Sequence, residues 1–280
     1  MARVPALAIL TAFTALSAPA AVVFGQKPAA VPAPVPPPPY ALVADLVRTS
    51  PSVVDAVIRS AARLKPQESP GLAPGFVRFD VTADVMAQIK GRESLPPRIN
   101  YLVDVPLDAR GRPPKLKALR VLLFAVPVPG KPDQLQLIGK RGQQGWTPAF
   151  DARIREIARA LVAADAPPEI TGIGNVFTVP GSLPGERETQ IFLTTKDGRP
   201  VSLSVIRRPG EAARWAVALS EIVDEAAAPP ARDSLLWYRL ACFLPPALPE
   251  RSVQTLDPAN ALGAREDYGF VLAQLGRCER

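Results

Sequence analysis

"ETQIFLTTKDGRPVSLSVIRRPGEAARWAVALSEI" (residues 188–222) is the stretch whose pattern most directly indicates a fold. Apolar and polar residues alternate in "VSLSV" (201–205), and on the other side of an Asp-Gly turn Ile191 and Leu193 occupy alternate positions of "IFLTT" (191–195). This alternation is typical of strands with one buried face, and Asp-Gly is a favoured hairpin turn. A Pro-Gly pair then precedes "WAVAL" (215–219), in which the large apolar residues Trp215, Val217 and Leu219 occupy alternate positions. The stretch therefore predicts three antiparallel strands joined in chain order.

A helix and a further strand precede this meander. Thr147 is a typical N-cap residue, Pro148 suits the first helical position, and apolar residues recur at helical spacing as far as Val162. Pro167-Pro168 ends the helix, and "ITGIGNVFTV" (170–179) follows as a strand. Residues 147–228 are therefore predicted to form one α+β unit.

A similar succession comes earlier, in residues 41–146. A short helical segment is expected in "LVADLVRTS" (42–50), and Ser50 with Pro51 indicates the start of a second helix that ends at Lys65-Pro66. Strands are then predicted in "FVRFDVTADV" (76–85), "INYLVDV" (99–105), "LRVLLFAV" (119–126) and "QLQLI" (134–138). The third of these is apolar nearly throughout, which indicates a strand buried on both faces.

The two units show some similarity. With a shift of 80 residues, the Pro-Gly turn at 129–130 falls on the one at 209–210, and apolar positions of 121–125 fall on those of 201–205. The predicted fold class is α+β, with a helix packed on an antiparallel β-meander. Two interpretations stay open: a tandem duplication, or two meanders that share only alternation and turns.

The C-terminal part, residues 229–280, is predicted to be a pair of helices. "RDSLLWYRLACFL" (232–244) is apolar on nearly every side, with Asp233 as the expected cap, and residues 258–276 form the second helix, with Leu262 among its inward residues. Cys242 and Cys278 are predicted to form a disulfide, which would close a loop of about 37 residues and stabilise the fold by about 3–4 kcal/mol.

The N-terminal segment has the pattern of an export signal. Residues 1–25 carry one Arg, an apolar stretch and then small residues, which is typical of a cleaved signal peptide. An uncleaved membrane anchor is the alternative, since residues 4–24 are about long enough to span a bilayer. Residues 26–40 are rich in proline and form a predicted extended linker.

The composition excludes several chemistries. The chain has 280 residues, no His and two Cys, so neither a His-activated nucleophile nor a four-ligand Cys/His zinc site can be built. The net charge of +7 comes from scattered residues, and no run of Lys and Arg indicates nucleic-acid binding. The sequence assigns no catalytic residue, cofactor or metal ligand.

Two groups of polar residues are candidate sites. Paired carboxylates at Asp80 and Asp84, or at Glu186 and Glu188, are the minimum that a hydrolase without His requires. The second group is a candidate ligand surface for an anion. It combines basic residues with an aromatic side chain in the 188–222 meander, namely Arg199, Arg207, Arg214 and Trp215.

Three functional hypotheses follow. The first is an exported, periplasmic or secreted, non-enzymatic binding or envelope-structural protein whose partner is a protein or an anionic envelope ligand. The second is a carboxylate-dependent hydrolase, which requires two acidic side chains with raised pKa values in one cleft. The third is a membrane-anchored periplasmic adaptor, which contacts the membrane through an uncleaved N-terminal segment.

Overall fold

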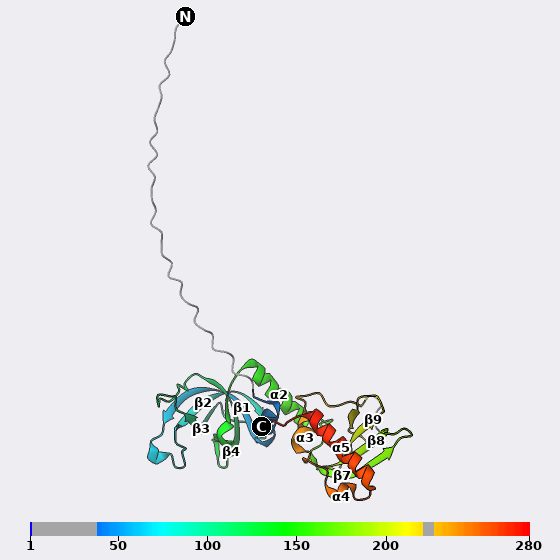
Figure 1. The fold of residues 1–280 in the computed structure, drawn as a ribbon. Coiled ribbons are helices and arrows are strands. Elements are labelled where there is room, and N and C mark those ends of the chain that lie inside the picture. The colour runs from blue at the N-terminus through cyan, green and yellow to red at the C-terminus, as the bar shows by residue number, and fades with distance from the viewer. Residues whose placement is uncertain (2–37, 221–226) are drawn as a thin grey trace. The chain divides into compact units, whose positions relative to one another are not determined.

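The computed structural model describes Met1, residues 38–220 and residues 227–280 (Figure 1). The predicted signal peptide lies outside these residues apart from Met1, and so does the predicted linker apart from its last three residues. The described chain contains both helices and strands, which confirms the α+β class.

The first half of the described chain consists of one helix and six strands. Helix α1 spans Tyr40–Thr49 and short 3-10 turns span Pro66–Glu68 (η1) and Gly139–Arg141 (η2). The strands are β1 (Ser52–Arg63), β2 (Phe76–Lys90), β3 (Arg98–Pro106), β4 (Arg120–Val128), β5 (Lys131–Leu137) and β6 (Gln143–Gly145).

Five of these strands close into a barrel. Their order is β1-β2-β3-β5-β4, and β4 pairs back with β1, while the short β6 lies along β4. All neighbours are antiparallel except β3 and β5, which run parallel. This is the connectivity of the OB-fold, a five-stranded Greek-key barrel. The prediction of a simple meander for residues 41–146 was therefore wrong, because a parallel pair far apart in sequence closes the sheet.

Strand β1 corrects a second prediction, since residues 51–64 were expected to be helical. Val54, Val57 and Ile58 fit a helical stripe by spacing, but residues 52–56 and Ile58 are all buried, in a strand covered on both faces. Two-sided burial removes the alternation that identifies a strand. The β-branched residues of the stretch favour the extended conformation that it adopts.

The second half contains helix α2 (Pro148–Val162) and a four-stranded antiparallel sheet. The strands are β7 (Ile170–Pro180), β8 (Arg187–Thr195), β9 (Val201–Arg207) and β10 (Arg214–Ala218), paired in the order β10-β9-β8-β7. This sheet is the predicted meander, and Thr147 caps α2 as expected by accepting a hydrogen bond from the Phe150 amide. A closed barrel and an open sheet differ in topology, so the structure does not contain two copies of one fold.

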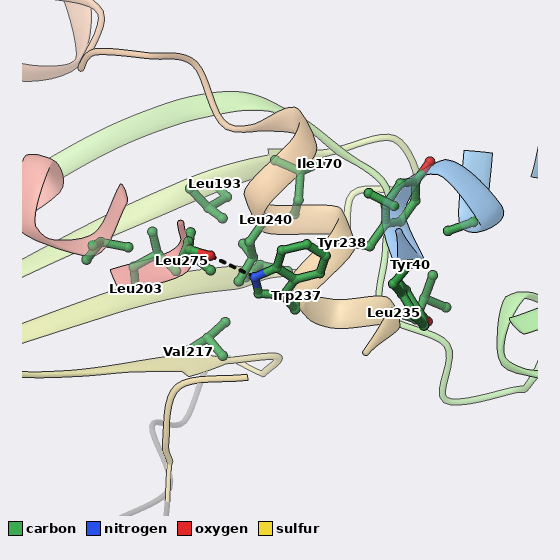
Figure 2. Packing of buried hydrophobic residues seen from close by; sticks show 14 of the residues in the cluster. Tyr40, Ile170, Leu193, Leu203, Val217, Leu235, Trp237, Tyr238, Leu240 and Leu275 are labelled. Carbon is green, nitrogen blue, oxygen red and sulfur yellow. Dashed lines mark hydrogen bonds between the residues drawn. The ribbon is translucent and has the colours of Figure 1, made fainter. Parts of the chain in front are cut away.

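The C-terminal helices pack on the sheet. They are α3 (Leu235–Phe243), α4 (Glu250–Val253) and α5 (Pro258–Leu275). Figure 2 shows Trp237 of α3 among buried residues of the sheet, with its indole Nε1 donating to the Leu275 carbonyl at 2.9 Å. The predicted Cys242–Cys278 disulfide is present.

Two details of these helices differ from expectation. The Ser234 side chain caps α3, whereas Asp233 has a positive φ of 61° and lies one residue before the cap. Leu262 is 60% exposed rather than inward, because Ala261 and Ala264 supply the inward positions of that turn of α5.

Helix α1 is fastened to the C-terminal part of the chain. The Asp45 carboxylate accepts a hydrogen bond from the Tyr238 hydroxyl and pairs with Arg280 at 3.0 Å. Arg280 also donates to the Cys242 carbonyl at 3.0 Å, beside the disulfide. Helix α1 and Arg280 are thus joined by an ion pair, next to the disulfide of the C-terminal part.

Two hydrophobic cores share the β1–β4 pair as a common wall. Val54 and Leu123 point into the barrel, whereas Val53 and Phe124 belong to the second core. That second core also takes residues from α1, α2, the open sheet, α3 and α5. Because neighbouring side chains of a strand point to opposite faces, one pair of strands contributes to both cores.

A buried carboxylate joins α5 to the open sheet. Asp267 is fully buried and accepts hydrogen bonds from Arg187 at 2.8 Å and 3.0 Å, from Arg207 at 2.5 Å and from Thr189 at 2.6 Å. Burial alone would raise the pKa of the Asp267 carboxyl, but the hydrogen bonds from Arg187, Thr189 and Arg207 outweigh it and lower the pKa below its usual value.

Replacing Asp267 with Asn should therefore destabilise the protein in a pH-dependent way. A lowered folded-state pKa contributes stability above the ordinary Asp value of about 3.9, and this contribution disappears as the pH falls through the folded-state pKa. We expect Asp267→Asn to lose about 3–5 kcal/mol near neutral pH, because Arg187 and Arg207 lose their shared carboxylate. Urea unfolding at neutral and acidic pH measures both effects.

The matched control is Glu266→Gln, which removes the exposed neighbouring carboxylate that pairs with Arg187 at 2.9 Å. It should change stability much less, because the pair is solvated. A free-energy difference between wild type and Asp267→Asn that stays constant down to the acidic limit would contradict the assigned role of the carboxylate.

Candidate functional site

The structure places the four predicted ligand-surface residues in different environments. Arg199 pairs with Asp197 at 2.8 Å in the β8–β9 hairpin, and Arg214 pairs with Glu211 at 2.9 Å. Arg207 is bound to Asp267. Trp215 is 8% exposed and packs in the second core. The structure therefore does not bring these side chains together as one group, and the ligand surface stays a prediction.

One member of each predicted carboxylate pair is held by other groups. Asp84 pairs with Arg98 at 3.1 Å and Arg59 at 3.4 Å, and hydrogen bonding to these cations lowers the pKa of its carboxyl. Glu186 accepts hydrogen bonds from the backbone amides of Ser182 and Leu183 in the β7–β8 turn. Among the described carboxyl groups with a shifted pKa, every shift is downward, whereas a general acid requires an upward shift.

A different group of side chains forms a cleft, called here the basic cleft. It has a volume of about 700 Å³ and lies between the end of β2 with the loop after it and the helices α2 and α3. Two carboxylates line it, Glu93 and Glu169. Six basic residues line it as well: Arg48, Lys90, Arg92, Arg155, Arg159 and Arg239. The lining thus contains four more basic than acidic residues, and Asp45 and Asp151 beside it pair with two of the six, Arg48 and Arg155.

Arg239 is the most unusual member of the basic cleft. It is 5% exposed, and its Nη1 lies 3.3 Å from the Glu169 carboxylate. Its Nε is buried and has no hydrogen-bond partner within the described residues. A buried guanidinium group with an unused donor has a substantial desolvation cost, which an added acceptor would offset.

Glu169 balances part of this charge. Its carboxylate pairs with Arg239 and, at 3.4 Å, with Lys196. Burial alone would raise the pKa of the Glu169 carboxyl, but Arg239 and Lys196 together lower it below the usual value. One carboxylate therefore serves two cations, and it does not engage the Nε of Arg239.

Three other cations of the basic cleft are bound within the protein. The Lys90 Nζ donates to the Val47 carbonyl at 2.7 Å, at the end of α1. The pKa of the Lys90 ammonium is lowered mainly by burial and further by the nearby positive charge of Arg48. Arg48 donates to the Tyr238 hydroxyl at 3.1 Å, and Arg155 pairs with Asp151 at 2.8 Å.

The remaining cations are available. Arg92 and Arg159 are exposed, and neither side chain has an ion pair or hydrogen bond to another described residue. Together with Arg239, they give the cleft three guanidinium groups that come from separate segments of the chain. Planar guanidinium groups suit oxyanions such as phosphate and carboxylate, which accept two hydrogen bonds at once.

Sequence reasoning missed this cleft because its residues are far apart in the chain. Arg48, Arg92, Arg159 and Arg239 lie on four separate segments. One local signal existed: Arg239 interrupts "LLWYRLACF" (235–243), a helix that is otherwise uncharged and apolar on nearly every side. A charged residue in a buried helix needs a partner, and this requirement indicates a site or an ion pair.

Two further properties of the described residues bear on the class of site. They contain no cluster of three or more acidic, Cys or His residues able to hold a metal ion. No described helix is both long enough and apolar enough to cross a membrane.

The described chain thus combines a barrel and an open sheet with a cleft lined mainly by basic residues. No known protein family matches the chain. No curated protein matches it either.

Replacing Glu169 with Gln should destabilise the protein and make its stability respond to anions. The change leaves the buried Arg239 without its carboxylate, so we expect a loss of about 1–3 kcal/mol at low salt. Phosphate at matched ionic strength should recover more of this loss than chloride does, because it supplies oxygen acceptors to Arg239. Thermal and urea unfolding in the two salts measure the effect.

Glu93→Gln is the control, since Glu93 lines the same cleft but is exposed and its side chain has no cation partner in the described part of the chain. Equal stability changes in the two variants, or no difference between phosphate and chloride, would contradict the role given to Arg239.

Proposed function

We propose that this chain is an exported, non-enzymatic binding protein, periplasmic or secreted, which holds an anionic ligand in the basic cleft. The observation that carries the proposal is the buried Arg239, whose Nε has no acceptor among the described residues. It lines a cleft together with Arg92 and Arg159, which have no carboxylate partner in the described part of the chain. A binding role requires no catalytic group, which agrees with a composition that lacks His.

The size and charge of the cleft define the class of ligand. A volume of about 700 Å³ is within the usual range for small-molecule sites and is much larger than one inorganic ion. Guanidinium groups from the loop after β2, from α2 and from α3 suit a ligand with more than one phosphate or carboxylate group. An anionic headgroup or a phosphorylated sugar of the cell envelope has this chemistry. Nucleic acid is a poorer fit, because the cleft is a local feature and the sequence contains no run of basic residues.

Export is supported by the N-terminal pattern and is compatible with the disulfide. Residues 1–25 have the order of charge, apolar stretch and small residues that signal peptides share. A disulfide such as Cys242–Cys278 persists in oxidising compartments. The membrane-anchored adaptor is the second candidate, since the apolar stretch of residues 4–24 is about long enough to span a bilayer.

The intact mass of the protein purified from its native cells distinguishes these candidates. For an exported protein we expect a mass below the full-length 29.9 kDa by the N-terminal segment, with both thiols unreactive until reduction. A full-length mass with the thiols blocked would favour the anchored adaptor. A full-length mass with two free thiols would contradict export.

Replacing Arg159 with Ser should weaken the binding of small polyanions to the mature protein. Pyrophosphate and citrate serve as probes for phosphate and carboxylate groups, and isothermal titration calorimetry measures their affinity. We expect a loss of about tenfold for the variant, the usual effect of removing one charge-assisted hydrogen bond. Higher salt should weaken binding as well.

Arg63→Ser is the matched control, because Arg63 is an exposed residue at the end of β1, outside the basic cleft. It should bind both probes like the wild type. Equal weakening in the two variants would show that the probes bind through the general positive charge of the surface and not in the basic cleft. The absence of any binding by the wild type would overturn the proposed ligand class.

A further inference from the structure

The barrel is open on one side, between β3 and β5. The two strands pair at Asn100–Gln134 and Tyr101–Leu135, and this ladder ends there. Strand β3 continues to Pro106 and β5 continues to Leu137. A groove of about 850 Å³ lies over this region and is lined by residues of both strands. It is called here the barrel groove, and it shares no lining residue with the basic cleft.

The groove exposes backbone groups as well as side chains. Residues 102–106 of β3 pair with β2 along their other edge, from Leu102–Asp80 to Pro106–Phe76. In an antiparallel pair, alternate residues direct their N–H and C=O groups to the neighbouring strand, and the residues between them direct theirs to the opposite edge. Within the described residues, that opposite edge has no strand ladder beyond Tyr101.

The floor of the barrel groove is apolar. Val103 and Leu135 are buried barrel residues that line the groove from beneath, and Leu137 is half-buried beside them. Leu102 lines the groove as well and is 50% exposed. An open strand edge above an apolar floor is the arrangement that a further strand can cover.

The charges of the barrel groove cancel. Arg78 donates to both oxygens of Asp104, at 2.6 Å and 2.8 Å, so these two lining residues neutralise each other. Asp80 and Lys140 are the other charged residues that line the groove, one of each sign. The groove is therefore neutral, in contrast to the basic cleft, and does not favour a polyanion. Its neutral rim fits an uncharged ligand that can pair with a backbone edge.

We propose that the barrel groove binds an extended, uncharged segment of another polypeptide, which adds a strand to the free edge of β3. The five residues from Leu102 to Pro106 offer an edge of about 16 Å. Backbone hydrogen bonds to this edge hold the segment, and alternate apolar side chains of the segment face the floor formed by Val103, Leu135 and Leu137. This site is independent of the anion-binding function.

Hydrogen exchange, measured on the mature protein, tests the site. The probe is a mixture of blocked hexapeptides that alternate Thr with Val, Leu or Phe. We expect those amides of residues 102–105 that face the free edge to exchange about tenfold more slowly with the mixture, because that edge becomes paired. The same peptides with N-methyl groups at alternate positions lack half of their donors and should not protect these amides.

Leu102→Lys is the protein variant, because it places a charge at the mouth of a neutral groove, and charged side chains block strand addition. Leu119→Lys is its control, since Leu119 is exposed to a similar extent, 46%, and lies outside the groove. Only the first variant should lose protection. Protection by the N-methylated peptides, equal effects of the two variants, or no protection by the unmodified mixture would each overturn the proposal.

Discussion

The shared wall of β1 and β4 holds the barrel and the open sheet together in one folded body. Val54 and Leu123 fill the barrel, and their neighbours Val53 and Phe124 extend the core that α2, α3 and the open sheet complete. Burial on both faces leaves no solvated side on which a polar substitution would be tolerated. The one acidic residue on this part of β1 is Asp55, which is 1% exposed, and it is matched by Arg120 of β4 at 2.6 Å. The wall therefore sets the relative position of α2 and the end of β2, between which the basic cleft lies.

The same wall explains how far the sequence predicts the fold. The two-sided burial of β4 was predicted correctly, because a short apolar run bounded by turns is typical of a buried strand. The same two-sided burial in β1 led to the wrong prediction of a helix. Val54, Val57 and Ile58 fit the helical period as well as the strand period when no polar residues mark an exposed face. The open sheet was predicted well, since its strands have one polar face and short turns. Closure of the barrel was not, because the pairing of β3 with β5 depends on contacts that leave no local pattern.

The candidate site was harder to predict than the fold. The residues chosen from the sequence, Arg199, Arg207 and Arg214, are close together in the chain, and each has a carboxylate partner in the structure. Those of the basic cleft come from α1, from β2 and the loop after it, from α2 and from α3, and proximity in sequence does not join them. Arg239 was the one informative position, because its helix is apolar all round. The disulfide was predicted correctly, since two cysteines allow a single pairing.

The ties between α1 and the C-terminal residues determine when the basic cleft forms. Asp45 contacts Tyr238 and Arg280, and Arg48 lies beside Lys90 in a cleft that α3 completes. Contacts that span almost the whole chain must order a long loop first, so they form after the local hairpins. While the chain is synthesised, the barrel strands and the meander are complete before α3 exists. The basic cleft can therefore be completed only after α3 has been synthesised.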